Sequence, residues 1–260
     1  MIRFFRVLLL GLMALAGTAM AAQEVRVGAY HFPPYVLKPE SEQPEGLLPE
    51  LLQALNQVQD DYLFRLVATS TMRRYRDLQS GRFDLILFES PSWGWQDTAH
   101  DALNLNIEDA EVYVARLKPG RDEGYFDDFT GKRMALYNGY HYGFAGFNSN
   151  QAFLTETFNA LLTYSHDSNV GMLLRDRADV AVVTRSYLQA YLQRYPGKAR
   201  ALLVSKRVDQ VYRHQALFRP ESPIAVAAFA DLLQLLNRDR QLDTLLERYH
   251  VEGAVGVPTD

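Results

Sequence analysis

The feature that most constrains the fold is a segment that occurs twice. The stretch LQSGRFDLILFES (78–90) reappears in weaker form as LLRDRADVAVVTRS (173–186). When the two copies are aligned on Asp84 and Asp179, their apolar runs coincide. A short, almost wholly apolar run is typical of a strand buried on both faces. The repeat therefore predicts two similar lobes with a cleft between them.

Each copy lies within an alternation of strand and helix patterns. In the first half we expect strands at 24–30, 62–69 and 83–88, and helices at 46–59 and 71–81. In the second half we expect strands at 132–139 and 179–183, and helices at 148–162, 168–177 and 185–195. This alternation indicates parallel α/β architecture.

Two alternating segments, 104–120 and 208–220, lie where the chain would pass from one lobe to the other and back. Two amphipathic segments after Pro220 predict C-terminal helices that cover an existing sheet. We therefore predict two α/β lobes joined by a two-segment hinge. The predicted ranges are 22–110 for the first part of lobe 1, 111–210 for lobe 2, and 211–260 for the return to lobe 1.

The N-terminus has the pattern of a cleavable signal peptide. Arg3 and Arg6 precede an apolar run that is shorter than the roughly 20 residues of a membrane span, and Ala19 and Ala21 suit a cleavage site. We expect residues 1–21 to be removed and the mature chain to be exported to the periplasm. The chain has no cysteine, which excludes a lipoprotein anchor and a disulfide framework.

Charge and motifs narrow the possible functions. Without Arg3 and Arg6 the chain has 27 − 2 = 25 basic and 31 acidic residues, a balance of −6, which disfavours nucleic acid or an anionic membrane as partner. The six histidines form no HExxH pair, and there is no GxSxG, GxGxxG or P-loop motif. We therefore predict no metal and no cofactor.

Candidate binding residues follow from the architecture, because the crevice of parallel α/β units lies beyond the carboxyl ends of the strands. Aromatic candidates suited to stacking and cation–π contact are Tyr30, Phe32, Tyr35, Trp93, Trp95, Tyr140 and Tyr142. The alternative is that these rings only pack the lobes. Trp93 and Trp95 are favoured because a Trp pair spaced by one Gly in a polar loop has little core to fill.

Polar candidates are Arg73 as an anion clamp, Glu89 as an amine ligand, His141 and Thr184. Arg73 could instead be a surface charge, as we expect of Arg74 and Arg76. Glu89 could simply pair with Arg73 and leave the pocket neutral.

The order of several segments resembles bacterial extracellular solute-binding proteins of family 3. The segments are VRVGAYHFPPYVL, GLLPELLQALN, LQSGRFDLIL, GKRMALYNG, RADVAVV and the C-terminal LDTLLERY, and they cover nearly the whole mature chain. The resemblance implies a type II periplasmic-binding-protein fold that captures amino acids or related solutes for ABC importers.

The family's amino-acid anchors are altered here. In the family, an Arg a few residues after the first-lobe strand clamps the α-carboxylate of the ligand, but no Arg follows the strand that ends near Phe88. A Ser or Thr that helps this clamp usually follows the glycine of the second-lobe strand, but Gly139 is followed by Tyr140. Thr184 stands where the family has the carboxylate that holds the α-amino group. We therefore expect a small amine-bearing, aromatic or amino-acid-like solute that is not a standard free α-amino acid.

The partner of such a monomeric binding protein would be an ABC permease or a membrane sensor. Two alternatives remain open at this point. One is an enzyme that resembles cyclohexadienyl dehydratases, with Glu89 or His141 as general acid. The other is a signalling module whose cleft no longer binds a ligand.

Overall fold

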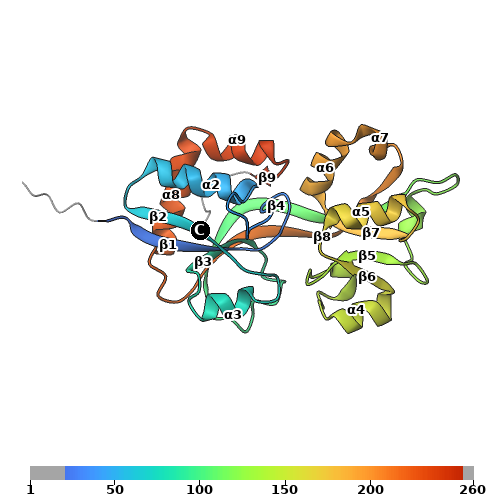
Figure 1. The fold of residues 1–260 in the computed structure, drawn as a ribbon, viewed down its shortest axis with the longest axis horizontal. Coiled ribbons are helices and arrows are strands. Elements are labelled where there is room, and N and C mark those ends of the chain that lie inside the picture. The colour runs from blue at the N-terminus through green and yellow to red at the C-terminus, as the bar shows by residue number, and fades with distance from the viewer. Residues whose placement is uncertain (1–20, 254–260) are drawn as a thin grey trace, which may run out of the picture.

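A computed structural model of the chain describes residues 21–253, so the predicted signal peptide lies, apart from Ala21, outside the described residues. The first lobe contains three parallel strands and four helices (Figure 1). They are β1 (Gln23–Ala29), α2 (Leu47–Val58), β2 (Tyr62–Ala68), α3 (Arg74–Gln79), β3 (Leu85–Glu89), α8 (Val226–Arg238) and α9 (Gln241–Arg248). Their positions agree with the sequence prediction, including the two C-terminal helices.

The second lobe repeats this plan. Its elements are η1 (Glu123–Phe126), β5 (Met134–Tyr137), η2 (Gly143–Ala145), α4 (Gln151–Phe158), β6 (Ala160–Thr163), α5 (His166–Leu174), β7 (Val180–Thr184), α6 (Arg185–Arg194) and α7 (Pro196–Ala199). Strand β5 pairs in parallel with both β6 and β7. Each lobe is therefore an α/β unit built around a central parallel strand.

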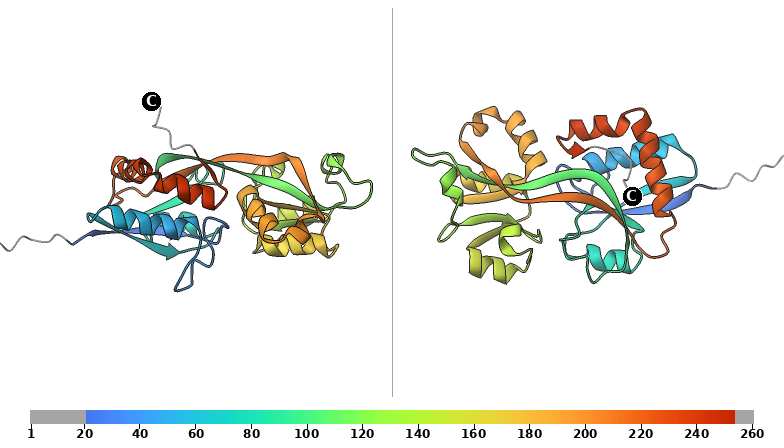
Figure 2. Two further views of the ribbon diagram at one scale, coloured as in Figure 1. Left: turned by 90° about the horizontal axis from the view of Figure 1, so that it is seen from above. Right: turned by 180° about the vertical axis from the view of Figure 1, so that it is seen from behind.

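Two long strands connect the lobes. Strands β4 (Asp101–Arg116) and β8 (Leu202–Phe218) pair antiparallel from Asp101↔Phe218 to Arg116↔Leu202 and run side by side through both lobes (Figures 1 and 2). The sheet order is β2-β1-β3-β8-β4-β7-β5-β6, with β9 (Glu252–Gly253) added to β4. The two-segment hinge is present. The predicted boundaries at 110 and 210 fall inside these strands and remain predictions.

The repeated aspartates make the same contacts in both lobes. Asp84 accepts hydrogen bonds from the Arg26 backbone N–H at 2.8 Å and from the Arg26 side chain at 2.7 and 3.0 Å. Asp179 accepts from the Arg133 backbone N–H at 3.0 Å and from the Arg133 side chain at 2.9 and 3.2 Å. Each aspartate therefore fixes its strand against the neighbouring parallel strand, β1 or β5.

One helix prediction was too long. We expected a helix over 148–162, but α4 ends at Phe158, because Asn159 adopts a left-handed conformation with φ of 49° and its N–H bonds the Leu154 carbonyl. The next four residues form β6, the edge strand beside β5. Pairing with β5 outweighs the helical pattern of the local sequence.

Candidate functional site

A small cavity of about 10 Å³ lies where the lobes and the two crossing strands meet. Its lining is Tyr30 and Phe32 after β1, Arg74 in α3, Trp93 after β3, Gly139, Tyr140 and His141 after β5, Glu111 in β4 and Gln210 in β8. The volume is about that of one water molecule. A solute can therefore enter only if the lobes separate or the lining side chains move.

The structure brings five of the eleven candidate residues to this cavity. They are Tyr30, Phe32, Trp93, Tyr140 and His141. All five follow the carboxyl ends of parallel strands, which is the location that the architecture predicts. Phe32 is at the centre of the ring contacts. It makes T-shaped contacts with Trp93 and Tyr140, with 5.8 and 5.7 Å between the ring centroids. Because Tyr140 belongs to the second lobe, these rings close the cleft.

Five candidate residues are buried but do not line the cavity: Tyr35, Glu89, Trp95, Tyr142 and Thr184. Tyr35 donates a hydrogen bond to Asp109 at 2.8 Å, and Trp95 donates from Nε1 to Glu89 at 2.9 Å. Thr184 contacts Glu111 and His166. Tyr142 donates its hydroxyl proton to the carbonyl of Tyr137 in β5 and is fully buried. The expectation that Trp95 has little core to fill was wrong, since only 1% of its surface is exposed.

The roles expected of Arg73 and Arg74 are exchanged. Arg73 is exposed at the N-terminus of α3, with its side chain on Ser70, and it does not line the cavity. Arg74, which we expected at the surface, is 2% exposed and lines the cavity. Successive residues at the start of a helix point in directions about 100° apart, so a shift of one position decides which arginine is buried.

Arg74 is held by a set of buried groups. Its Nε lies 3.4 Å from Glu89 Oε2, and Nη2 donates to the Tyr75 hydroxyl at 2.8 Å. Its guanidinium carbon lies 4.8 Å from the centroid of the Tyr30 ring. Burial alone would lower the pKa of Arg74, but Glu89 and the surrounding tyrosines outweigh it and raise that pKa. Arg74 is thus charged and already paired with Glu89.

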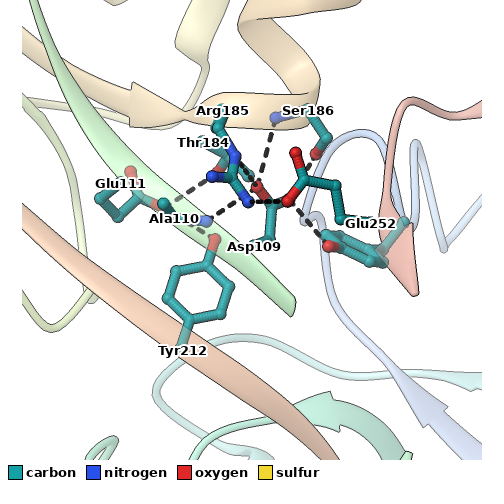
Figure 3. A network of polar contacts seen from close by, with 9 residues as sticks. Asp109, Ala110, Glu111, Thr184, Arg185, Ser186, Tyr212 and Glu252 are labelled. Carbon is teal, nitrogen blue, oxygen red and sulfur yellow. Dashed lines mark hydrogen bonds and ion pairs between the residues drawn. The ribbon is translucent and has the colours of Figure 1, made fainter. Parts of the chain in front are cut away.

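The sequence analysis missed Glu111, the carboxylate that faces the cavity. It is 1% exposed in the middle of β4 and lies in register with Thr184 of β7 (Figure 3). Its Oε1 accepts hydrogen bonds from Thr184 at 3.0 Å and Tyr212 at 3.3 Å, whereas Oε2 has no partner within residues 21–253. A signal existed: Asp109 and Glu111 alternate along a strand predicted to cross between the lobes, which places both on one face.

Glu111 and Tyr140 each bring to the cavity a buried polar atom without a hydrogen-bond partner among the described residues. Burial raises the pKa of Glu111 well above its ordinary range, and the nearby Asp109 and Asp209 raise it further. The buried Tyr140 hydroxyl also has no hydrogen-bond partner in the described chain. An unpaired buried polar atom costs about 1–3 kcal/mol. The cavity therefore presents an acceptor and a hydroxyl to whatever enters it.

His141 is held by the crossing strand β8. Gln210 donates from Nε2 to the His141 carbonyl and accepts from Trp93 Nε1 at 3.2 Å, so Gln210 connects a residue of each lobe. Burial, together with the positive charge of Arg74, lowers the pKa of the His141 imidazole to about 4. At neutral pH this imidazole is uncharged.

Residues 21–253 contain neither a potential metal site nor a helix suited to crossing a membrane. No three His, Asp or Glu side chains in that range gather as a potential metal site. Over the same range, none of the helices has the length and apolarity that a membrane crossing needs.

The fold is that of type II periplasmic binding proteins, as solved structures show. The ligand-binding core of GluR0 from Nostoc punctiforme in complex with L-glutamate is similar, with 16% identity, a TM-score of 0.66, and coverage of 86% of this chain and 98% of that one. A histidine kinase sensor domain has 18% identity, a TM-score of 0.65 and coverage of 90% and 99%.

A third similar structure is an ancestral amino acid-binding protein described as a precursor of cyclohexadienyl dehydratase. It has 17% identity, a TM-score of 0.63 and coverage of 87% and 94%. No protein-family model and no curated protein sequence matches the chain. These likenesses show that the chain shares this fold.

Proposed function

We propose that this protein is an exported solute-binding protein that closes its two lobes on a small amine-bearing solute. The observation that carries the proposal is Glu111, a buried carboxylate at the cavity whose Oε2 has no hydrogen-bond partner in the described chain. An ammonium group would supply a donor and a charge to this oxygen. Burial disfavours the ionised form of Glu111, and the positive charge of the solute would offset this desolvation cost.

Glu111 takes the place of the carboxylate that the family resemblance led us to seek at Thr184. The two residues are register partners on β4 and β7, and their side chains are hydrogen-bonded. The amine-binding group has therefore moved by one strand. The surrounding rings of Tyr30, Phe32 and Tyr140 would cover the apolar part of the solute by stacking or cation–π contact.

A standard free α-amino acid remains excluded from the proposal. Such a ligand needs a cation for its carboxylate, and the cation at the cavity, Arg74, is already paired with Glu89. The net charge of the three buried groups Glu89, Arg74 and Glu111 is negative when both carboxylates are ionised. This balance favours a solute with an amine and no carboxylate.

Binding would shift the population toward the closed arrangement, since the solute contacts both lobes only when they are closed. The predicted signal peptide would carry the protein to the periplasm, where an ABC permease or a membrane sensor would recognise the closed monomer. The histidine kinase sensor domain with this fold supports a sensor as partner, and the substrate binding protein of an amino acid ABC transporter, which has the same fold, supports a permease.

The test is a thermal-shift screen of residues 22–260 against amines, polyamines, aromatic acids, amino acids and short peptides. A true solute at a hundredfold excess over its Kd should stabilise the fold by about 2.7 kcal/mol. We expect an amine hit that Glu111→Gln weakens at least tenfold and that Glu108→Gln, on the same strand, leaves unchanged. A hit confined to carboxylic acids, or one indifferent to Glu111→Gln, would refute the proposal.

A dehydratase-type enzyme is the second candidate. A carboxyl with a raised pKa can donate a proton, and burial raises the pKa of both Glu111 and Glu89. Glu111 is favoured because it lines the cavity, whereas Glu89 is paired with Arg74 away from the lining and the pKa of His141 is low. Conversion of a cyclohexadienyl substrate that Glu111→Gln abolishes would establish the enzyme. Stoichiometric binding without turnover would establish the binding protein.

A further inference from the structure

A second and larger cavity opens between the lobes, away from Glu111. Its volume is about 180 Å³, compared with about 10 Å³ for the cavity at Glu111. The loop after β1 contributes His31, Pro33 and Pro34, and helices α5 and α6 of the second lobe contribute the opposite wall. Its size suits a small organic molecule that would contact both lobes at once.

The wall on α6 is a row of tyrosines. Tyr187, Tyr191 and Tyr195 are spaced by four residues, so they lie on one face of the helix. Their ring centroids are 5.9 and 5.0 Å apart along the row. Together with the two prolines opposite, these rings form an apolar surface suited to an aromatic ring.

The wall also holds polar groups, and the most buried of them is His166, which is 1% exposed. Its Nε2 lies 3.1 Å from Thr184 Oγ1, and Nδ1 has no hydrogen-bond partner among residues 21–253. Burial lowers the pKa of His166 to about 3, so the ring is neutral at pH 7 and carries one N–H.

The position of that proton follows from the neighbouring groups. Thr184 donates its hydroxyl proton to Glu111 Oε1, which also accepts from Tyr212. The Thr184 oxygen must then accept from His166 Nε2–H, because its own proton is already used. His166 Nδ1 is therefore a bare acceptor, and a molecule bound beside it has to supply a hydrogen-bond donor.

The charge at this end of the cavity is negative. Asp167 lines the cavity next to His166 and is exposed. The cations lie toward the C-terminal end of the tyrosine row: Arg194 lies 5.4 Å from the Tyr195 ring centroid, and the Lys198 ammonium lies 4.2 Å from that of Tyr195 and 5.5 Å from that of Tyr191. A donor that also carries positive charge fits the pair of His166 and Asp167 better than a neutral hydroxyl does. An anion would face an acceptor nitrogen and a carboxylate.

We propose that this cavity is a second ligand site, distinct from the one at Glu111, and that it binds a small aromatic amine. The amine lies at His166 and Asp167, and the ring lies between the tyrosine row of α6 and the prolines of the first lobe. Since both lobes line the site, its occupant favours the closed arrangement. The two sites have different lining residues, although the hydrogen bonds from His166 through Thr184 connect this site to Glu111.

The test is calorimetric titration of residues 22–260 with phenethylamine, and with 2-phenylethanol and 3-phenylpropionate as neutral and anionic counterparts. We expect saturable one-site binding of phenethylamine, at least fivefold weaker binding of the alcohol, and none of the acid. Ala190→Phe, which fills the cavity from α6, should weaken phenethylamine binding at least tenfold, and Ala190→Ser should not.

Asp167→Asn provides a second variant, at an exposed position, should Ala190→Phe fail to fold, and we expect at least fivefold weaker binding. Glu108→Gln, a surface variant on β4, should leave phenethylamine affinity unchanged, and Ala190→Phe should leave the binding of an amine at Glu111 unchanged, which separates the two sites. The proposal is overturned if phenethylamine shows no saturable binding, if the acid binds as tightly as the amine, or if binding responds to Glu111→Gln and not to the cavity variants.

Discussion

Asp84 and Asp179 are equivalent residues that anchor equivalent strands in the two lobes. Each accepts two side-chain hydrogen bonds and one backbone hydrogen bond from a single arginine, Arg26 or Arg133. They differ in burial: the Asp84 side chain is 2% exposed and also bonds Arg219, whereas that of Asp179 is 29% exposed. Equivalent contacts should therefore contribute unequally to stability.

We predict that Asp84→Asn lowers the free energy of unfolding at pH 7 by about 1.5–3 kcal/mol, the range for hydrogen bonds to charged groups. Asp179→Asn should cost less than about 1 kcal/mol, because solvent screens that pair. Urea unfolding of both variants measures the difference. Equal losses would show that burial does not control the strength of these contacts.

The loss of unfolding free energy caused by Asp84→Asn should also depend on pH. Burial alone would raise the pKa of Asp84, but the bonds from Arg26 and Arg219 outweigh it and hold that pKa below its usual value. A lowered pKa contributes stability that is complete above the unfolded value of about 3.9 and is lost as pH falls through the folded value. The difference in unfolding free energy between wild type and Asp84→Asn should thus be constant above pH 5 and become smaller below pH 4.

The buried ion pair of Arg74 and Glu89 leads to a second prediction. Truncating Arg74 leaves a carboxylate that is 0% exposed without its cation. We expect Arg74→Met to lower the free energy of unfolding by about 3–5 kcal/mol. The matched control, Arg73→Met, should stay within about 0.5 kcal/mol because Arg73 is exposed. Chemical denaturation of both variants measures these losses of unfolding free energy. A larger loss for Arg73→Met than for Arg74→Met would contradict our assignment of Arg74 as the buried arginine.

A third prediction concerns Glu111 in the absence of solute. Its pKa is raised in the folded state, so its ionisation opposes folding increasingly as pH rises above about 4.3. Glu111→Gln keeps an acceptor for Thr184 and Tyr212 and removes the charge. The variant should therefore match wild type near pH 4 and become more stable at higher pH, by up to about 1.4 kcal/mol per pH unit until the folded pKa is reached.

Unfolding free energies of Glu111→Gln and of the control Glu108→Gln between pH 4 and 8 would check this. Glu108 pairs with Arg213 at the surface, and its variant should follow the wild-type pH profile. If the unfolding free energy of Glu111→Gln changed with pH in parallel with that of wild type, burial would not raise the pKa of Glu111 in the folded state.

The fold was predictable because its signals are local and repeated. Hydrophobic periodicity placed most elements, and the aspartate repeat indicated two lobes. Strand β6 was missed because residues 160–163 continue a helical pattern, and only pairing with the distant β5 makes them a strand. Long-range pairing of this kind leaves little trace in a local sequence window.

The candidate site was predictable only in outline. Strand ends placed Phe32, Trp93 and Tyr140 near the cleft, because parallel strands end at a common edge. Glu111 was missed because its burial arises from β7 on one side and β8 on the other, which come 69 and more residues later in the chain. Arg74 was misplaced because neighbouring arginines at a helix start differ in direction and not in composition.

Closure of the lobes leads to the last prediction. Gly139 of the second lobe has a φ of +82°, and a Cβ there would lie 2.6 Å from Thr71 Oγ1 of the first lobe. Gly139→Ala should therefore hold the lobes apart, whereas Gly131→Ala, with a similar φ of +71° and open space around it, adds the same backbone strain without the contact. Small-angle scattering should give a larger radius of gyration for Gly139→Ala alone. Identical scattering of the two variants would mean that Thr71 yields to the methyl group and that the lobes stay closed.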